Sequence, residues 1–179
     1  MAEQQDGIDL LIHDHREVEQ LFQRFETGGD DATRKQLVEQ ITTELSKHAA
    51  AEEQYLYPLT AEAVAGGADL AEHSVEEHQE MKDTLHELQG MDATDPAYGQ
   101  RVQELIAEVR HHVEEEEGDL FPKLRQAVGE DRIMELGGQL ETAKKMAPTQ
   151  PHPHAPNTPP ANKVAGPIAG AVDRLTGKG

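Results

Sequence analysis

Apolar side chains recur every three or four residues over most of the first 147 residues, which is the spacing of one face of an α-helix. Helix-favouring Ala, Leu, Glu, Gln, Lys and Arg dominate this region, and the β-branched runs typical of strands are short. The pattern predicts four long helices and a shorter fifth, at roughly 7–27, 32–65, 68–89, 96–128 and 130–146.

Short turns separate the predicted helices. Glycine pairs stand at Gly28-Gly29 and Gly66-Gly67, and Asp95-Pro96 places a capping residue before a proline at the first helical position. Four helices joined by such turns predict an all-α fold, an antiparallel up-down four-helix bundle. Pro58 and Pro122 are expected to kink the second and fourth helices.

The composition changes after residue 147. Residues 148–163 read PTQPHPHAPNTPPANK, and proline at this density predicts an extended or disordered segment. The chain is therefore divided into a bundle, 1–147, and a Pro-rich tail, 148–179. A short terminal helix is expected at most over 164–176, where a weak apolar stripe is interrupted by Gly166-Pro167.

The charge of the chain excludes several classes of partner. Asp and Glu number 35 against 16 Lys and Arg, a formal net charge of −19, which argues against binding to nucleic acid or to an anionic membrane surface. No apolar run is long enough to span a bilayer, and the N-terminus lacks the pattern of a secretory signal. We expect a cytoplasmic monomer. Because Cys is absent, thiolate metal sites and disulfides are excluded.

Ten histidines in a chain with six aromatic residues raise the question of metal ligands. The second and fourth predicted helices carry the same pattern at an offset of 64 residues: His-x-x-x-Glu-Glu, then Leu, an aromatic residue and Pro. The first and third helices match at an offset of 63, where Asp14-His15 corresponds to Glu77-His78. The bundle is predicted to consist of two similar helix pairs, with equivalent side chains facing one another at its centre.

Six polar side chains continue the apolar stripes of these helices, and we expect them to point into the interior: His15, His48, Glu52, His78, His112 and Glu116. A buried ionised carboxylate is costly unless it is paired or bound to a cation. A cluster of two metals resolves this, with two histidines on each ion and the two glutamates bridging them. Such donors suit iron or manganese, and zinc is not excluded.

The alternative is that these are solvated ion pairs. His-x-x-x-Glu also occurs at His13/Glu17, His73/Glu77 and His111/Glu115, and one such motif in an acidic helix is usually a surface pair. The repeat, the proline ten residues after His48 and His112, and the position on the apolar stripe favour metal binding for the six.

Two further residues are candidates for the site. His73 lies about 140° around its helix from His78, so it is either an additional metal ligand or a solvated histidine. Tyr55 lies seven residues after His48, nearly in line with it. Its phenol either bonds to the cluster or to a bound ligand, or packs in the core with its hydroxyl satisfied.

These motifs resemble the haemerythrin-like, HHE cation-binding family. The resemblance spans roughly residues 7–128 and implies a four-helix bundle with two iron ions in a non-haem, oxo- or hydroxo-bridged centre. It implies terminal ligation by His15, His48, His78 and His112, with Glu52 and Glu116 as bridging carboxylates. Oxygen-carrying haemerythrins have a fifth histidine where this chain has Ser74, and an aspartate in place of Glu116.

Family members without the fifth histidine are associated with iron–sulfur repair, sensing of nitric oxide or oxygen, and decomposition of peroxide. The expected function is therefore a di-iron protein that binds or reduces a small oxidant (O2, H2O2 or NO) in a stress response. Alternatives are an iron or oxygen sensor that uses the tail as its output, an iron-handling protein, and a metal-free acidic interaction bundle. A ferritin-like oxidase requires two Glu-x-x-His motifs. This chain has one, Glu108-x-x-His111, and it lies off the core face, which argues against that alternative.

Overall fold

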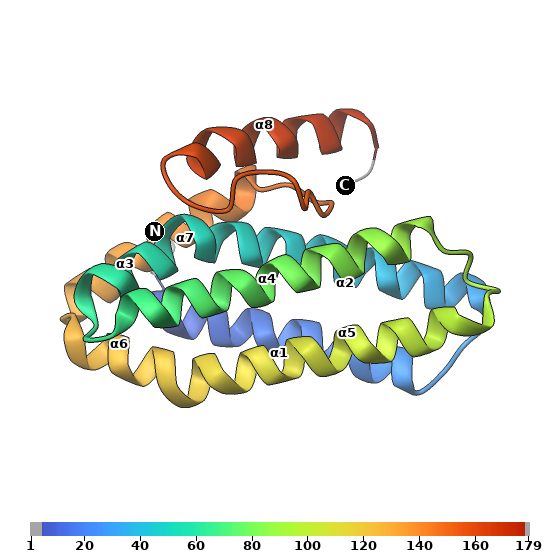
Figure 1. The fold of residues 1–179 in the computed structure, drawn as a ribbon, viewed down its shortest axis with the longest axis horizontal. Helices are drawn as coiled ribbons and strands as arrows, with labels where there is room; N and C mark the ends of the chain where they lie inside the picture. The colour runs from blue at the N-terminus through green and yellow to red at the C-terminus, as the bar shows by residue number, and fades with distance from the viewer. Residues whose placement is uncertain (1–4, 178–179) are drawn as a thin grey trace.

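The computed structural model describes residues 5–177, and no strand occurs among them. The helices of the bundle are α1 (Gly7–Glu26), α2 (Asp31–Ala51), α3 (Tyr57–Ala63), α4 (Gly67–Gly90), α5 (Pro96–Glu115) and α6 (Phe121–Ala127). Two more follow, α7 (Glu130–Met146) and α8 (Ala161–Leu175). Figure 1 shows the long helices running side by side in alternating directions, which confirms the predicted all-α bundle.

Two of the predicted helices are interrupted by a π-helical segment. The segment η1 (Glu52–Leu56) joins α2 to α3, and η2 (Glu116–Leu120) joins α5 to α6. In each, a wide i→i−5 bond closes the turn, from the Tyr57 N–H to the Glu52 carbonyl and from the Phe121 N–H to the Glu116 carbonyl. Proline follows one residue later in both, and because it has no N–H and clashes with the preceding turn, a regular α-helix cannot continue there. At each position where a kink was expected, the structure has one π-helical turn, which contains one residue more than an α-helical turn.

Aspartates fix where three of the helices begin. Asp6 accepts hydrogen bonds from the Ile8 and Asp9 N–H groups at the start of α1, and Asp30 accepts one from Thr33 at the start of α2. Asp95 caps α5, with Pro96 in the first turn as predicted. The turn before α4 needs glycine, because Gly66 has a left-handed φ of 73°.

The apolar core forms two clusters along the bundle axis. One lies toward the α1–α2 and α4–α5 turns and contains Phe22, Leu45, Leu85 and Leu105. The other lies toward α3, α6 and α7 and includes Leu11, Leu56, Leu124 and Leu140. The six histidines and glutamates singled out above occupy the level between the two clusters, so apolar side chains close the polar centre off at both ends.

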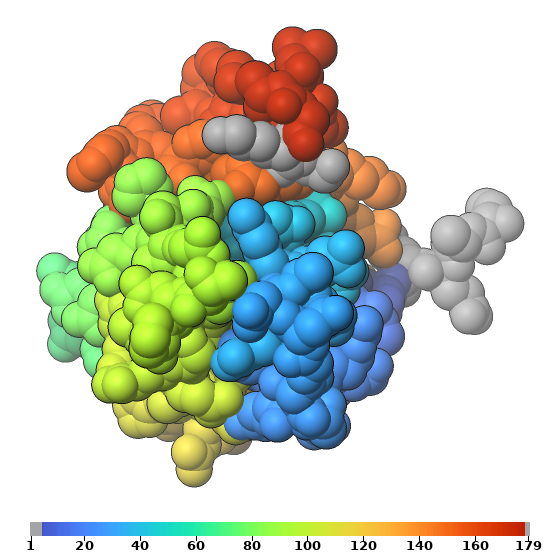
Figure 2. Space-filling view, turned by 90° about the vertical axis from the view of Figure 1, so that its right-hand side faces the viewer, coloured from blue at the N-terminus to red at the C-terminus, as the bar shows by residue number. Residues whose placement is uncertain are grey.

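Beyond the bundle, α7 packs on α1 and α2, and the tail covers the same side of the molecule (Figures 1 and 2). Residues 148–160 contain no helix, yet they are held in place: the buried Asp173 accepts hydrogen bonds from the N–H groups of Thr149 and Gln150 and from His152. These hydrogen bonds connect residues 149–152 to α8. The helix α8 runs through Pro167 and turns its apolar stripe outward, since Val164, Ile168, Val172 and Leu175 are more than half exposed.

Within residues 5–177, none of the helices is both long and apolar enough to cross a bilayer.

Candidate metal centre

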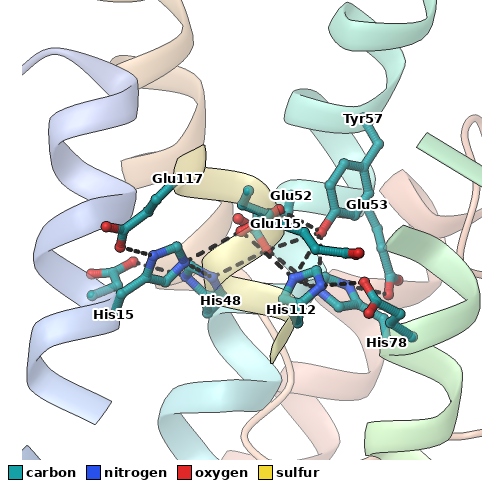
Figure 3. A network of polar contacts seen from close by, with 12 residues as sticks. His15, His48, Glu52, Glu53, Tyr57, His78, His112, Glu115 and Glu117 are labelled. Atoms are coloured by element: carbon teal, nitrogen blue, oxygen red, sulfur yellow. Dashed lines mark hydrogen bonds and ion pairs between the residues drawn. The ribbon is translucent and has the colours of Figure 1, made fainter. Parts of the chain in front are cut away.

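The six side chains predicted to converge do so inside the bundle. In Figure 3, His15, His48, Glu52, His78 and His112 point toward one another. Each comes from a different element: His15 from α1, His48 from α2, Glu52 from η1, His78 from α4, His112 from α5 and Glu116 from η2. None is more than 6% exposed. They form two adjoining groups that share Glu52, one with His15, His48 and Glu116 and the other with His78 and His112.

Each imidazole is oriented by an outer carboxylate that contacts its Nδ1. The distances are 2.8 Å from His15 to Glu117 and 3.1 Å from His78 to Glu53. His48 and His112, which are equivalent in the repeat, contact the equivalent carboxylates Asp14 and Glu77. The distances are 3.3 Å from His48 to Asp14 and 2.7 Å from His112 to Glu77. The sequence repeat is therefore a structural repeat, and it includes the carboxylates that orient the rings.

These contacts determine where the imidazole lone pairs lie. An ionised carboxylate only accepts hydrogen bonds, so Nδ1 carries the proton and the lone pair of Nε2 faces inward. The Nε2 atoms of His15 and His48 are 3.2 Å apart, and so are those of His78 and His112. Two lone pairs at that distance repel unless a proton or a metal ion lies between them. Burial lowers the pKa of His48 and, together with the charge of His112, lowers that of His78 well below its usual value, so a proton is disfavoured on these two rings. Burial acts in the same direction on His112, but the charge of Glu116 and the hydrogen bond to Glu77 outweigh it and raise its pKa.

The two glutamates lack the partners that buried carboxylates need. Glu52 Oε1 and Glu116 Oε2 are buried without a hydrogen bond, although Glu116 Oε2 lies 3.3 Å from His15 Nε2. Among the described residues no Lys or Arg forms an ion pair with either glutamate. Burial and the neighbouring charge of Glu116 raise the pKa of Glu52 well above its usual value. Burial acts on Glu116 in the same direction, but when the rings are protonated the charges of His112, His15 and His48 and the hydrogen bond from His15 outweigh it and hold the pKa of Glu116 at about 2. With neutral imidazoles, a bound cation would supply that positive charge. Four imidazole nitrogens around two under-partnered carboxylates thus fit a pair of divalent cations.

Within the described part of the chain, basic side chains neutralise three of the four outer carboxylates and none of the inner ones. Arg16 makes two hydrogen bonds to Glu117, at 2.8 and 2.6 Å, and Lys82 lies 2.6 Å from Glu53. Lys144, from α7, contacts Asp14. The positive charge therefore supports the residues that orient the histidines and leaves the centre open to a cation.

The tyrosine at the centre is Tyr57, whereas Tyr55 follows the second of its two alternatives and packs against the core. Tyr57 donates a hydrogen bond of 2.9 Å to Glu116, and its hydroxyl is 3.0 Å from His78 Nε2. Tyr55 instead packs among the apolar side chains toward α3, with Lys163 over its ring. The extra residue of η1 is the reason: it rotates the following chain by about one residue, 100°, relative to a regular helix. The only sequence signal was the aromatic residue before each repeated proline.

Phe121 is the repeat partner of Tyr57. Its ring is stacked on that of His15 with the centroids 5.9 Å apart, while Tyr57 is 5.2 Å from His78. Both aromatic residues cover a histidine from the same end of the bundle, but only Tyr57 brings a hydroxyl.

His73 does not join the buried centre. Its side chain is 54% exposed, and its Nε2 is 2.9 Å from Glu115 on the surface. The other histidines expected to be solvated include His13 and His111, which are 62% and 65% exposed.

A cavity of about 90 Å³ adjoins the centre on the side away from Tyr57. Its walls are the histidines themselves and the apolar side chains of Val18, Phe22, Leu45, Met81, Val109 and Val113. At its outer edge Arg110 forms ion pairs with Glu19 and Glu26 across the space between α1 and α5. The cavity has room for a molecule of two or three heavy atoms and little more.

Comparison with known proteins agrees with this geometry. An uncharacterized hemerythrin-like protein of Schizosaccharomyces pombe is 32% identical over 168 residues, covering 93% of this chain and 83% of that protein. A DNA nickase of Nostoc is 29% identical over 136 residues, which cover 76% of this chain but only 38% of the nickase. No solved structure matches the chain significantly. Residues 6–124 match the hemerythrin HHE cation binding domain, and the chain belongs to that family.

Proposed function

We propose that the protein is a non-haem di-iron protein that binds or reduces a small oxidant, O2, H2O2 or NO, at the buried centre. The observation that carries the proposal is the pair of Nε2–Nε2 contacts at 3.2 Å beside two carboxylate oxygens without partners. The ligands would be His15 and His48 on one ion and His78 and His112 on the other, with Glu52 and Glu116 shared between them. Bound there, iron would supply the electrons for reduction of the oxidant.

The surroundings of the centre support a small, uncharged reactant. The adjoining cavity of about 90 Å³ is lined by the histidines and by apolar side chains, so it accommodates a diatomic molecule or peroxide and excludes larger substrates. The Arg110 ion pairs cover its outer edge. The Tyr57 hydroxyl lies within hydrogen-bond distance of Glu116 and can donate a proton there. Because burial and the charges of Glu116 and Glu52 raise the pKa of Tyr57 well above 10, the phenol keeps its proton at neutral pH.

The test is the iron content of the purified protein and its optical spectrum, before and after addition of peroxide, nitric oxide or dithionite. We expect two irons per chain and a spectrum that changes with at least one of these reagents. His112→Ala and Glu116→Ala should lower the iron content, whereas the surface variant His86→Ala should keep it. Two irons with an unchanged spectrum in His112→Ala would show that the ligands are wrong. Protein that holds no metal, and whose melting temperature is indifferent to chelator, would favour a metal-free interaction bundle.

A sensing role is the second candidate, and one contact favours it. The Asn162 side chain, at the start of α8, donates a hydrogen bond to the Glu53 carbonyl in η1. Because Glu52 lies in the same π-helical turn as Glu53, a movement of Glu52 at the centre would be transmitted to the tail through this hydrogen bond. A tail deletion that leaves every partner and phenotype unchanged would remove this idea.

Cleavage of DNA, the activity in the name of the Nostoc relative, finds no support in this chain. Its net charge of −19 opposes approach to a phosphate backbone, and the similarity covers 38% of that protein. A plasmid-nicking assay with the metal-loaded protein would detect it.

A further inference from the structure

A second cluster of metal-binding side chains lies on the surface, outside the buried centre. His73 and Glu77 are one turn apart on α4, and Glu115 ends the neighbouring helix α5. One ligand atom from each lies within 4.8 Å of the other two. His73 Nε2 is 2.9 Å from Glu115 Oε2 and 3.8 Å from Glu77 Oε1.

These distances suit a shared ion. Zinc binds imidazole nitrogen and carboxylate oxygen at about 2.0–2.2 Å, so two ligands of one ion lie at most about 4.4 Å apart. Only a small side-chain rotation is needed to bring all three within that limit. One imidazole and two carboxylates suit zinc and ferrous iron, and the half-exposed position leaves room for water ligands.

The chain contains a natural comparison for this cluster. His13 and Glu17 are also one turn apart on a helix, 3.5 Å from each other and exposed. They do not belong to any group of three potential ligands among the described residues. Convergence of ligands from two helices is therefore what distinguishes the cluster at His73 from an ordinary surface pair.

Glu77 connects the surface cluster to the buried centre. One of its oxygens faces His73, and the other accepts a hydrogen bond of 2.7 Å from His112 Nδ1. A cavity of about 80 Å³ between α4 and α5 is lined both by Glu77 and His111 and by the buried rings of His78 and His112. Glu80 and Glu108 also line it, so its walls carry negative charge that attracts cations.

We propose that His73, Glu77 and Glu115 form a surface site for a divalent transition-metal ion, and that metal reaches the buried centre by way of this site. The binding of an ion at the surface stands independently, whereas the loading role rests on the proposed function.

The first experiment counts zinc ions bound to the full-length protein by equilibrium dialysis. We expect the wild type to bind one zinc more per chain than His73→Ala, or to bind that zinc at least about tenfold more tightly. Glu115→Gln should behave like His73→Ala, and the matched variant His13→Ala like the wild type. Equal binding by His73→Ala and His13→Ala would overturn the site. The zinc that His73→Ala retains reports on the buried centre, so failure of one site leaves the other measurable.

The second experiment follows uptake of ferrous iron by the metal-free protein under anaerobic conditions, by competition with a coloured chelator. We expect His73→Ala to fill more slowly than His13→Ala, by about tenfold, and to reach the same final iron content. Equal rates would overturn the loading role. A wild type that takes up no iron would overturn the loading role together with the proposed function, while the zinc measurement would still decide the surface site.

Discussion

Tyr57 places a hydroxyl group beside the six ligand candidates. The shortest contacts of this hydroxyl are to Glu116 and His78. Glu116 Oε2 already lacks a hydrogen bond, so the contact from Tyr57 to Oε1 is a large part of what satisfies this carboxylate before metal binds. The phenol therefore stabilises the metal-free protein as well as facing the site.

We expect Tyr57→Phe to keep the fold, because Phe121 occupies the equivalent place in the other half. The metal-free variant should lose about 1–3 kcal/mol of unfolding free energy, the usual cost of leaving a buried acceptor unsatisfied. Urea denaturation measures this. Tyr98→Phe is the control, because Tyr98 is equally buried but lies in the core cluster away from the centre. An equal loss in both variants would show that the contact to Glu116 is not responsible.

The sequence predicts the six ligand candidates better than it predicts the side chains that contact them. His15, His48, Glu52, His78, His112 and Glu116 each continue an apolar stripe, so helical periodicity alone brings them together. The sequence did not single out Tyr57, and considered Tyr55 for the centre, because periodicity assumes a regular helix through η1. The outer carboxylates, such as Glu117 and Asp14, belong to the sequence repeat but lie off the stripes, so their contacts with the histidines become visible only when neighbouring helices are placed side by side.

Among the secondary-structure elements, the π-helical segments bring residues five positions apart onto the same inward face. Glu52 and Tyr57 are five residues apart, yet both reach the centre, and their side chains are in contact at 3.4 Å. In a regular α-helix a separation of five residues is about 500°, which leaves the two side chains 140° apart. The sequence indicated the interruption through Pro58 and Pro122, but a proline alone does not distinguish a kink from a π-helical turn.

Helix α1, which supplies His15, depends on its N-terminal cap. Asp6 binds two N–H groups of the first turn and pairs with Arg125 of α6. Asp6→Ala should cost about 1 kcal/mol of unfolding free energy, mostly from the lost cap. Asp6→Asn keeps the cap and loses the ion pair, so it should cost less. Equal losses in the two variants by urea denaturation would contradict the capping role.

The effect of Asp6→Ala should also depend on pH. Partial burial acts to raise the pKa of Asp6, but the hydrogen bonds from Arg125 and from the Asp9 and Ile8 N–H groups hold it below the ordinary value of 3.8. Because the folded pKa is lower than the unfolded one, the ionised side chain stabilises the fold above about pH 4, and this contribution is lost as pH falls through the folded value. The difference between wild type and Asp6→Ala should therefore shrink between about pH 7 and about pH 3.

At the scale of the whole molecule, the tail is a separate layer fastened to the bundle at a few points. Within the tail, Asp173 binds Thr149, Gln150 and His152. The tail is joined to the bundle where Asn162 donates a hydrogen bond to the Glu53 carbonyl and where Gln79 donates one to the Pro153 carbonyl. The sequence could not predict this layer, because it depends on one buried acid meeting backbone N–H groups more than twenty residues away. The bundle, by contrast, follows from local periodicity and short turns.

Asp173→Ala should release this layer without unfolding the bundle. The substitution removes the acceptor of two backbone N–H groups, at a cost of about 1–3 kcal/mol that falls on the tail. Hydrogen exchange should become faster in α8 and residues 149–152 and stay unchanged in α1, α2, α4 and α5. Thr158→Ala, an exposed tail position, is the control. Exchange that accelerates equally throughout the chain would show that the tail and the bundle unfold together.

The internal repeat also provides an internal control for experiments at the centre. Because the two halves orient their histidines through equivalent carboxylates, the effect of a substitution in one half can be compared with the unchanged equivalent position in the other half. The halves differ at Tyr57 and Phe121, so one side of the centre faces a hydroxyl and the other a phenyl ring. The two halves of the repeat therefore place their histidines alike but are chemically unequal at this one position.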